Sequence, residues 1–393
     1  MPPILYFFAL CNLVIGSSAF ALNGILQPVS TALGISVAAA GQVMTAYAIA
    51  TAVLAPLFIV LTARWPKKRT VQFSLALFTA GCLLSAVAPN LLTLLMGRAL
   101  MGAGAMFTAT ASALAVTMVS PALRGRALST VFMGMSISYA VGLPLGAWLG
   151  FEYGWRVPMW LSVAASLSAL VAASWLIPSN MTSGSASFAG FRAAARQGAV
   201  LRIWLRTLLS FVAIFSVFTY IGPVLLALNP MGSSQLAMTL VMFGLAGVVG
   251  SAAGGWASDH FGAMRTIKTG LVVLIAMLAV LPFTAGHMPL MLLVLAVWAI
   301  FGFGLMSPQQ SLLASLSPAQ APLLLSLNSS MLYIGTALGA IISGAAISHT
   351  GFAHIAWVGT PFGLAAVLTL LFDRTPQALP VKATAAVASE CRS

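Results

Sequence analysis

One arginine, Arg98, lies well inside an apolar stretch, about seven residues from where the stretch begins. Burying a guanidinium in a membrane costs on the order of 3 kcal/mol, so it needs a partner. The chain holds only four acids, Glu152, Asp259, Asp373 and Glu390, and none of them falls inside an apolar stretch. Arg98 therefore predicts an anchor for an anionic or strongly hydrogen-bonding cargo. The alternative is an arginine that reaches the membrane interface and tethers neighbouring helices.

A second set of side chains could bind a ligand without carrying charge. They are polar, isolated among apolar residues, and typical of a mostly apolar cavity with a few fixed hydrogen bonds. For each one, packing between helices is the alternative. Together with Arg98 we take them as candidate substrate-binding residues: Asn23, Tyr47, Tyr139, Tyr220, Gln309, Gln310, Asn328 and Tyr333.

The sequence offers no pattern for catalysis or for a cofactor. Cys11, Cys82 and Cys391 have no paired spacing, so they indicate neither a disulfide framework nor a metal site. All four histidines fall between the apolar stretches, and no phosphate-binding glycine loop, HExxH or CxxC motif occurs. We expect no enzyme activity, no metal, no cofactor and no ATP-driven transport by this chain alone.

Composition requires a lipid environment for most of the surface. Of 393 residues, 61% are hydrophobic and 5% charged, whereas soluble domains carry about 25% charged residues. The apolar runs, such as Leu271–Phe283 and Leu290–Met306, are continuous, while the strands of a membrane barrel alternate apolar and polar residues. The fold class is therefore an all-α membrane protein, because in lipid every backbone polar group must be paired internally.

Polar breaks divide the chain into twelve expected membrane spans with both termini on one side. The Ala19-Phe20-Ala21 stretch resembles a signal-peptidase site, but the basic segment of a signal peptide is missing, which favours a retained first helix. The spans are 5–27, 39–62, 70–88, 91–119, 129–150, 157–177, 207–228, 236–257, 269–286, 290–312, 323–347 and 355–372.

The net charge of +13 is explained by topology rather than by nucleic-acid binding. Lys and Arg are enriched in cytoplasmic loops. Fifteen of the seventeen fall on the side of the termini, and the exceptions are Arg98 and Arg156. We therefore expect an inner-membrane protein with both termini in the cytoplasm. The fifteen are Arg64, Lys67, Lys68, Arg69, Arg124, Arg126, Arg192, Arg196, Arg202, Arg206, Arg265, Lys268, Arg374, Lys382 and Arg392.

The chain divides into two halves of six expected spans each. Residues 179–206 form the longest polar interruption, Ser- and Gly-rich and then basic, which is typical of a linker. We expect an N-terminal bundle over 1–178, a C-terminal bundle over 207–372 and a cytoplasmic tail over 373–393.

Features recur between the two halves at a nearly constant offset. Pro28, expected to close the first span of its half, and Pro223, which follows Tyr220-Ile221-Gly222 in the first span of the other half, lie 195 residues apart. Parallel six-helix repeats are typical of transporters that rock about a central site. Glycines four residues apart recur as well, at an offset of 193, in the fifth span of each half, where they favour close helix packing. These stripes are Gly142, Gly146 and Gly150 in one half and Gly335, Gly339 and Ser343 in the other, and Pro144 beside the first is expected to let its helix bend.

Several motifs make the chain resemble the major facilitator superfamily over about residues 10–370. The family's loop motif G-x-x-x-D-R-x-G-R-[RK] stands in the second half as Gly255-Trp256-Ala257-Ser258-Asp259-His260-Phe261-Gly262, with Arg265 three residues on. In the first half Ile59 and Ala63 replace its Gly and Asp, and Arg64 remains. The span-four motif appears as Arg98-Ala99-Leu100-Met101-Gly102-Ala103-Gly104, and Gly142-Leu143-Pro144-Leu145-Gly146 followed by Gly154-Trp155-Arg156 matches the span-five signature.

The match is closest to the drug:proton antiporter-1 branch, among arabinose- and sugar-efflux permeases. It implies a monomeric secondary transporter for small molecules, active in efflux and multidrug resistance, with protons as a candidate coupling ion. It further implies gating residues Arg64, Gly142, Pro144, Gly146, Gly255, Asp259, Gly262 and Arg265.

In the family this loop latches the cytoplasmic gate while the transporter faces outward. Asp259 could do so at the N-terminus of a neighbouring helix, where the helix dipole favours an anion. The alternative is a solvated turn residue, and Ala63 leaves any latch one-sided.

This chain departs from the branch in one respect. Members often carry an acid in the first span, where Ser18-Ala19-Phe20 stands here, and proton coupling needs a buried group that binds a proton. The alternatives to proton-coupled export are a proton-independent facilitator, an uptake carrier and a non-transporting membrane receptor or scaffold.

Overall fold

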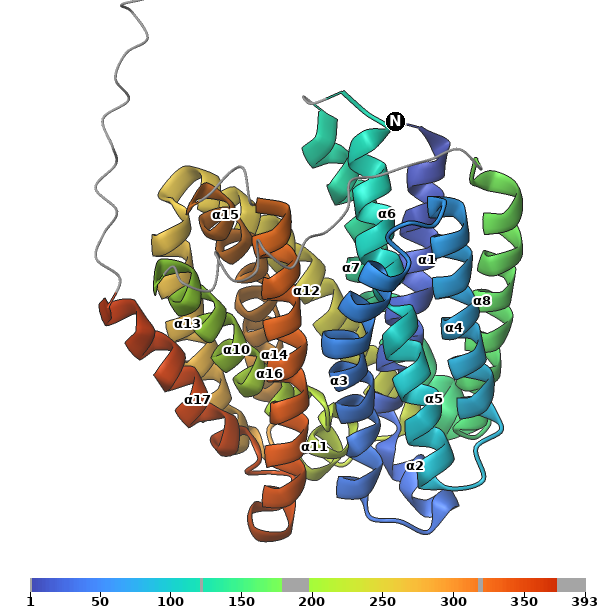
Figure 1. The fold of residues 1–393 in the computed structure, drawn as a ribbon. Coiled ribbons are helices and arrows are strands. Elements are labelled where there is room, and N and C mark those ends of the chain that lie inside the picture. The colour runs from blue at the N-terminus through green and yellow to red at the C-terminus, as the bar shows by residue number, and fades with distance from the viewer. Residues whose placement is uncertain (1, 121–122, 179–197, 317–320, 373–393) are drawn as a thin grey trace, which may run out of the picture.

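The computed structural model describes residues 2–120, 123–178, 198–316 and 321–372, and in these ranges the regular structure is helical. Each half of the chain forms its own group of helices (Figure 1). The first group is α1 (Pro3–Phe20), the 3-10 turn η1 (Ala21–Gly24), α2 (Leu26–Leu33), α3 (Val37–Leu61), α4 (Lys67–Ala86), α5 (Leu91–Gly104), α6 (Met106–Thr117), α7 (Arg124–Glu152) and α8 (Arg156–Leu176). The second is α10 (Gly198–Phe218), α11 (Ile221–Leu228), α12 (Ser233–Phe261), α13 (Ala263–Val280), η3 (Leu281–Thr284), α14 (Met288–Gly304), α15 (Met306–Leu316), α16 (Ala321–Thr350), α17 (Ala356–Leu368) and η5 (Thr369–Phe372).

Ten helices in the described ranges are long and apolar enough to cross a membrane. Two further expected spans correspond to α4 and α17. The first turn of α4 carries Lys67, Lys68 and Arg69, which lowers its mean hydropathy, and α17 with η5 is a shorter apolar helix. The count of twelve spans stays a prediction, while the membrane-spanning, all-helical architecture is established.

Four expected spans are broken into two pieces each, which the sequence analysis missed. In the first span of each half the break separates α1 from α2 and α10 from α11. The expectation that Pro28 closes the first span is wrong, because Pro28, like Pro223 in the other half, lies near the start of the short helix that follows the break. A proline fits there since the first turn of a helix leaves its N–H groups unpaired. The fourth span of each half is broken as well, at Ala105 and at Leu305.

The predicted linker boundary is also wrong at its second end. Helix α10 begins at Gly198, so its first residues, including Arg202 and Arg206, are helical. Arg206 is buried rather than placed in a polar loop, and its Nε donates a hydrogen bond of 2.9 Å to Thr369 Oγ1. Arg98 is consequently not the only arginine buried inside a bundle. Residues 179–197 of the linker and the tail lie outside the described residues.

Both glycine stripes pack against a neighbouring helix as predicted. On α7, a Cβ at Gly142 or Gly146 would lie 2.2 Å from Ser17 Oγ or 2.9 Å from Ala21 Cβ, both on the α1–η1 segment. On α16, a Cβ at Gly335 would lie 2.4 Å from the carbonyl oxygen of Leu208 on α10. Both stripes therefore press a long helix against the first helix of its own half.

The two groups meet through two helix pairs, α7 with α12 and α3 with α16. Figure 1 shows the groups close together at the end that holds α2 and α11, and diverging toward the end that holds the N-terminus and α15. We call the first end the far side and the second the near side.

Candidate functional site between the two helix groups

Tyr220 closes the far side of the interface. It lies at the junction of α10 and α11, is fully buried, and its hydroxyl is 3.2 Å from the carbonyl oxygen of Ala340 and 3.3 Å from that of Ala38. Gln42 Nε2 donates to the Tyr220 hydroxyl over 3.4 Å and to the Ala340 carbonyl over 3.5 Å. Because Ala38 and Gln42 belong to the other half of the chain, this phenol joins the two halves.

Two glycines make room for the Tyr220 side chain. A Cβ at Gly41 on α3 would lie 2.2 Å from the Tyr220 ring, and one at Gly344 on α16 would lie 2.6 Å from its hydroxyl. These are distances that a real Cβ does not adopt. The closed far side therefore depends on the absence of two side chains, one from each half.

A second far-side contact joins the two helix breaks. The side-chain amide of Asn23, in η1, donates to the carbonyl oxygen of Phe218 over 3.3 Å. Beside it, a Cβ at Gly222 would lie 2.3 Å from the carbonyl oxygen of Gly24. Glu152 at the end of α7 also accepts a hydrogen bond from Ser233 of the other half. Asn23 and Tyr220, predicted to line a cavity, thus form part of the closure.

Below this closure lies a cluster of aromatic rings from both halves. Phe20 stacks on Tyr139 with ring centroids 4.8 Å apart, and both contact Phe218 of the second half, at 5.7 and 6.0 Å. Phe303, which follows Gly302 near the end of α14, approaches the Tyr139 ring to 4.5 Å. The other members of this aromatic cluster are Phe211, Phe215, Phe243 and Trp298.

Arg98 lies next to the aromatic cluster but does not reach the interface of the membrane with water. It is 1% exposed, and one of its terminal nitrogens donates to the carbonyl oxygens of Ser18 and Ala19 over 3.0 and 3.1 Å. Its other two nitrogens form no hydrogen bond with the described residues. Both bonds end one turn before η1, where the helix is about to break. These bonds tether α5 to α1, as in the tethering role considered for Arg98. The two nitrogens without a bond leave donors for the other role considered, the binding of cargo.

Tyr47 and Tyr333 bring the two halves together beside Arg98. Their rings make an edge-to-face contact at 6.3 Å, from α3 and α16 respectively. The backbone of Tyr47 packs directly on Gly102, where a Cβ would lie 2.3 Å from the Tyr47 carbonyl oxygen. Gly102 is one helical turn after Arg98, so these three predicted side chains do gather in one region.

Gln309 and Asn328 lie instead inside the second half. Both are almost fully buried, and their side-chain oxygens are 3.1 and 2.8 Å from the hydroxyl of Thr207 on α10. The first half holds a related tie, in which Asn12 bonds the carbonyl oxygen of Val131 and accepts from Thr108. This placement favours the packing alternative for Gln309 and Asn328. Gln310 is partly exposed on α15.

On the near side no hydrogen bond or ion pair joins the predicted latch residues to one another in the described part of the chain. Asp259 is exposed at the end of α12 and forms no hydrogen bond or ion pair with the part of the chain that is described. Gly262 ends that helix with a φ of +84°, which permits the turn into α13, and Arg265 is exposed one turn later. Gly255 is partly buried on α12, and Arg64 is exposed after α3.

Several site residues escaped the sequence analysis. Gln42 and the aromatic cluster were missed, since a phenylalanine in an apolar helix carries no sign of whether it faces lipid, core or interface. Gln42 could have been found, because it is a lone amide in an apolar stretch, as Asn23 is. Within the described ranges no group of His, Cys, Asp or Glu could hold a metal ion. The site is therefore built from rings, hydroxyls, amides and one guanidinium.

Comparison with known proteins gives one consistent result. The chain matches the Major Facilitator Superfamily over residues 8–322 and 231–393. It is 29% identical to the uncharacterized MFS-type transporter YbcL of Bacillus subtilis, covering 95% of this chain and 96% of that protein. It is also 29% identical to the inner membrane transport protein YdhP of Escherichia coli, covering 92% and 93%.

A more distant relative is a probable sugar efflux transporter of Mannheimia succiniciproducens, 23% identical over 94% of each chain. Among solved structures, the crystal structure of a D-xylose-proton symporter superposes with a TM-score of 0.75, at 13% identity, over 93% of this chain and 96% of that one. At that identity the likeness extends to the fold.

Proposed function

Because this chain belongs to the Major Facilitator Superfamily, we propose that it is a secondary active transporter that exports small neutral or anionic molecules by alternating access. That it is a membrane transporter and not an enzyme follows from the family and the relatives. Export, the class of cargo and the coupling are the proposal. The efflux named for one relative and the inner-membrane location named for another agree with it.

The single observation that supports alternating access is that the two halves are held together on the far side but not at the expected latch on the near side. On the far side Tyr220, Gln42 and Asn23 hold the halves together through hydrogen bonds. On the near side Asp259, the expected latch, has no partner among the described residues. Since basic residues concentrate on the near side, we assign that side to the cytoplasm. The conformation is then inward-facing, with the outer gate closed and the inner latch released.

Arg98 supports the proposed preference for neutral or anionic cargo. The described acids, Glu152 and Asp259, are exposed at helix ends, so no carboxylate neutralises Arg98 inside the spans. A lipophilic cation would meet a like charge at low dielectric, whereas a neutral or anionic solute could accept from the unused donors of Arg98. The aromatic cluster beside it offers apolar area for the rest of such a solute.

A second candidate, a carrier that needs no protons, is favoured by the same missing carboxylate. Proton-driven exchange needs a group that binds and releases a proton as access alternates. Glu152 and Asp259 are the acids in the described ranges, and both lie outside the membrane interior. Any proton dependence should therefore be weak, or carried by a residue at a helix end such as Glu152.

The proposal is tested with purified protein in liposomes, with and without an imposed pH gradient. Three radiolabelled solutes are compared: a neutral pentose, a small organic anion and the cationic dye ethidium. We expect transport of the pentose or the anion, a small effect of the gradient, and loss of transport in Arg98→Met. Strong proton-driven export of ethidium, unchanged by that substitution, would refute the proposed cargo preference.

A further inference from the structure

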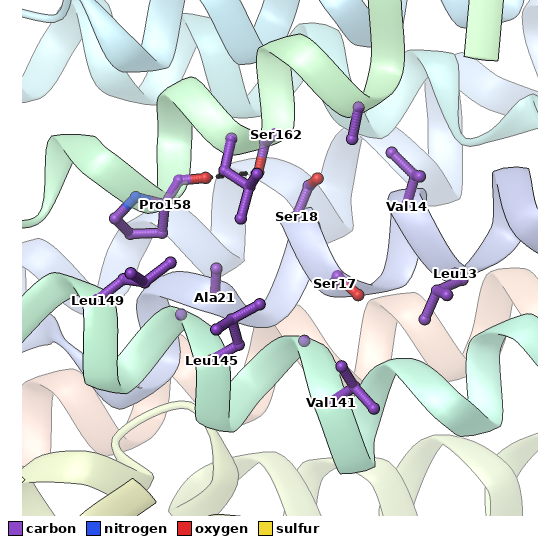
Figure 2. A pocket seen from close by; sticks show the side chains of 14 residues that line it. Leu13, Val14, Ser17, Ser18, Ala21, Val141, Leu145, Leu149, Pro158 and Ser162 are labelled. Carbon is purple, nitrogen blue, oxygen red and sulfur yellow. Dashed lines mark hydrogen bonds between the residues drawn. The ribbon is translucent and has the colours of Figure 1, made fainter. Parts of the chain in front are cut away.

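A pocket opens on the outer surface of the first half, between α7 and α8, with α1 as its floor (Figure 2). Its rim is apolar and exposed: Val141 and Leu145 on α7 are 49% and 39% exposed, and Leu161 on α8 is 48% exposed. Ser17 and Ala21 of the α1–η1 segment lie at the bottom. The pocket is separate from the aromatic cluster and from Arg98, which lie on the inner side of α1.

The pocket lining carries no charge, and its polar groups leave almost no hydrogen-bonding capacity for a ligand. Ser162 already donates to the carbonyl oxygen of Pro158 within α8 over 2.9 Å. The Arg98 guanidinium takes the backbone oxygen of Ser18 from the other side. The hydroxyl of Ser17, at the bottom of the pocket, forms no hydrogen bond with the described residues. The chemistry of the pocket therefore fits hydrocarbon rather than a polar solute.

The size and position of the pocket fit one leaflet of a bilayer. Along the first span it runs from Leu13 to Ala21, about 12 Å at a rise of roughly 1.5 Å per residue. One leaflet contributes about 15 Å, half of a hydrocarbon core of about 30 Å. All three helices are long and apolar enough to span the membrane, and the pocket occupies their far-side half. The medium that meets its mouth is therefore the acyl-chain region of the far-side leaflet.

We propose that this pocket is a lipid site that holds one acyl chain of a phospholipid from the far-side leaflet. An unfilled slot would forfeit dispersion contacts along its walls, and hydrocarbon restores them. An exposed stripe of α1 leads toward it, since Tyr6 and Leu10 are each 55% exposed on the near-side half of that helix.

Occupancy of the pocket bears on the proposed transport cycle. Helix α7 packs closely on α1 and on α12 of the other half, but touches α8 only lightly. An acyl chain in the pocket therefore occupies the loosely packed contact between α7 and α8, and α7 is one of the helices that form the interface between the halves. Through α7 the bilayer can bias the rocking motion. This consequence rests on the proposed function, while lipid occupancy does not.

The test is photolabelling of the reconstituted protein. Vesicles contain a trace of phospholipid with a diazirine halfway along one acyl chain, and the adducts are located by peptide mass spectrometry after illumination. We expect adducts on Ser17–Ala21, which a lipid chain reaches through the pocket. Filling the slot by Ala165→Phe should abolish those adducts, whereas Ala164→Phe, at the adjacent exposed residue outside the lining, should leave them unchanged.

Leu145→Phe narrows the pocket from the α7 side and replaces Ala165→Phe in the test if that variant does not fold. Folding is checked by the thermal unfolding temperature. Absence of adducts on Ser17–Ala21 while the exposed face of α8 is labelled would overturn the lipid site. So would equal labelling of these residues in Ala165→Phe and Ala164→Phe. Because labelling is read without transport, failure of the proposed function leaves this test intact.

Discussion

Replacing Gly41 with alanine should open the far side. A Cβ at Gly41 would lie 2.2 Å from the nearest ring carbon of Tyr220 and 2.4 Å from its hydroxyl oxygen. The ring is fully buried and held against α16 by Ala340, so it has little freedom to move away. Gly41 and Tyr220 belong to opposite halves. The added methyl group is therefore accommodated most easily by separating the halves at this end.

The magnitude follows from the cost of overpacking a tight contact. Forcing a methyl group into a packed site costs typically about 1–3 kcal/mol. That cost falls on the inward-facing state alone, since the contact is absent once the halves part. At about 1.4 kcal/mol per tenfold change, the population open on the far side should rise roughly five- to 150-fold.

The assay is labelling from outside with a membrane-impermeant maleimide. Ala337 on α16 is 3% exposed and lies one turn inward from Ala340, so Ala337→Cys reports on opening of the closure. Cys391 is replaced by serine, while Cys11 and Cys82 are buried and stay. We expect the labelling rate in Gly41→Ala to exceed that of the parent by the factor above.

Gly302→Ala is the matched control, because a Cβ at this helical glycine meets its nearest neighbour at an ordinary 3.4 Å. Truncating the ring by Tyr220→Leu should remove most of the extra effect of Gly41→Ala, since the two side chains then no longer collide. An unchanged or slower labelling rate in Gly41→Ala would refute the reasoning. An equal increase in Gly302→Ala would show that any added methyl group loosens the fold.

Three further predictions concern the latch, the buried arginine and the topology. Asp259→Asn should slow transport while leaving the thermal unfolding temperature of the inward-facing protein nearly unchanged, because Asp259 has no partner among the described residues in this state. Its charge-assisted hydrogen bonds, worth about 1.5–3 kcal/mol each, belong to the outward-facing state. A wild-type transport rate in this variant would show that Asp259 is an ordinary loop residue. Arg98→Lys should retain more transport of a neutral or anionic solute than Arg98→Met, since a Lys keeps the positive charge. An equal loss of transport in both variants would indicate that Arg98 acts by tethering α5 to α1 through its two bonds to Ser18 and Ala19. Reporter fusions within residues 179–197 and after residue 393 should both read cytoplasmic, and a periplasmic signal at either would contradict the topology.

The helical spans and the family could be predicted because both depend on local sequence. Long apolar runs require helices in lipid, whatever surrounds them. The motifs at Arg98, Gly142–Gly146 and Asp259 carry the resemblance on their own. The glycine stripes predicted a packed face, and the structure places α1 and α10 on those faces. Each of these inferences needed only one segment of chain at a time.

The roles of the polar residues could not be predicted in the same way. Tyr47, Tyr220 and Asn328 are all single polar residues in apolar stretches, so nothing local distinguishes them. Their positions differ: Tyr47 meets the other half beside Arg98, Tyr220 closes the far side, and Asn328 is packed within one half. Which face of a helix meets which neighbour is decided by tertiary packing, and helix periodicity is uninformative when every face is apolar.

The offset between the two halves also bears on which residues meet at the far-side closure. If the two halves are related by an axis along the membrane normal, residues close to that axis contact their own counterparts. The offset of 195 residues between Pro28 and Pro223 maps Asn23 onto Phe218, and Asn23 does donate to the carbonyl oxygen of Phe218. The same offset maps Gly24, the last residue of η1, onto Thr219, which directly follows the end of α10 at Phe218, so the two helix breaks lie at corresponding positions. The Asn23–Phe218 contact of the far-side closure therefore lies close to the axis that relates the two halves.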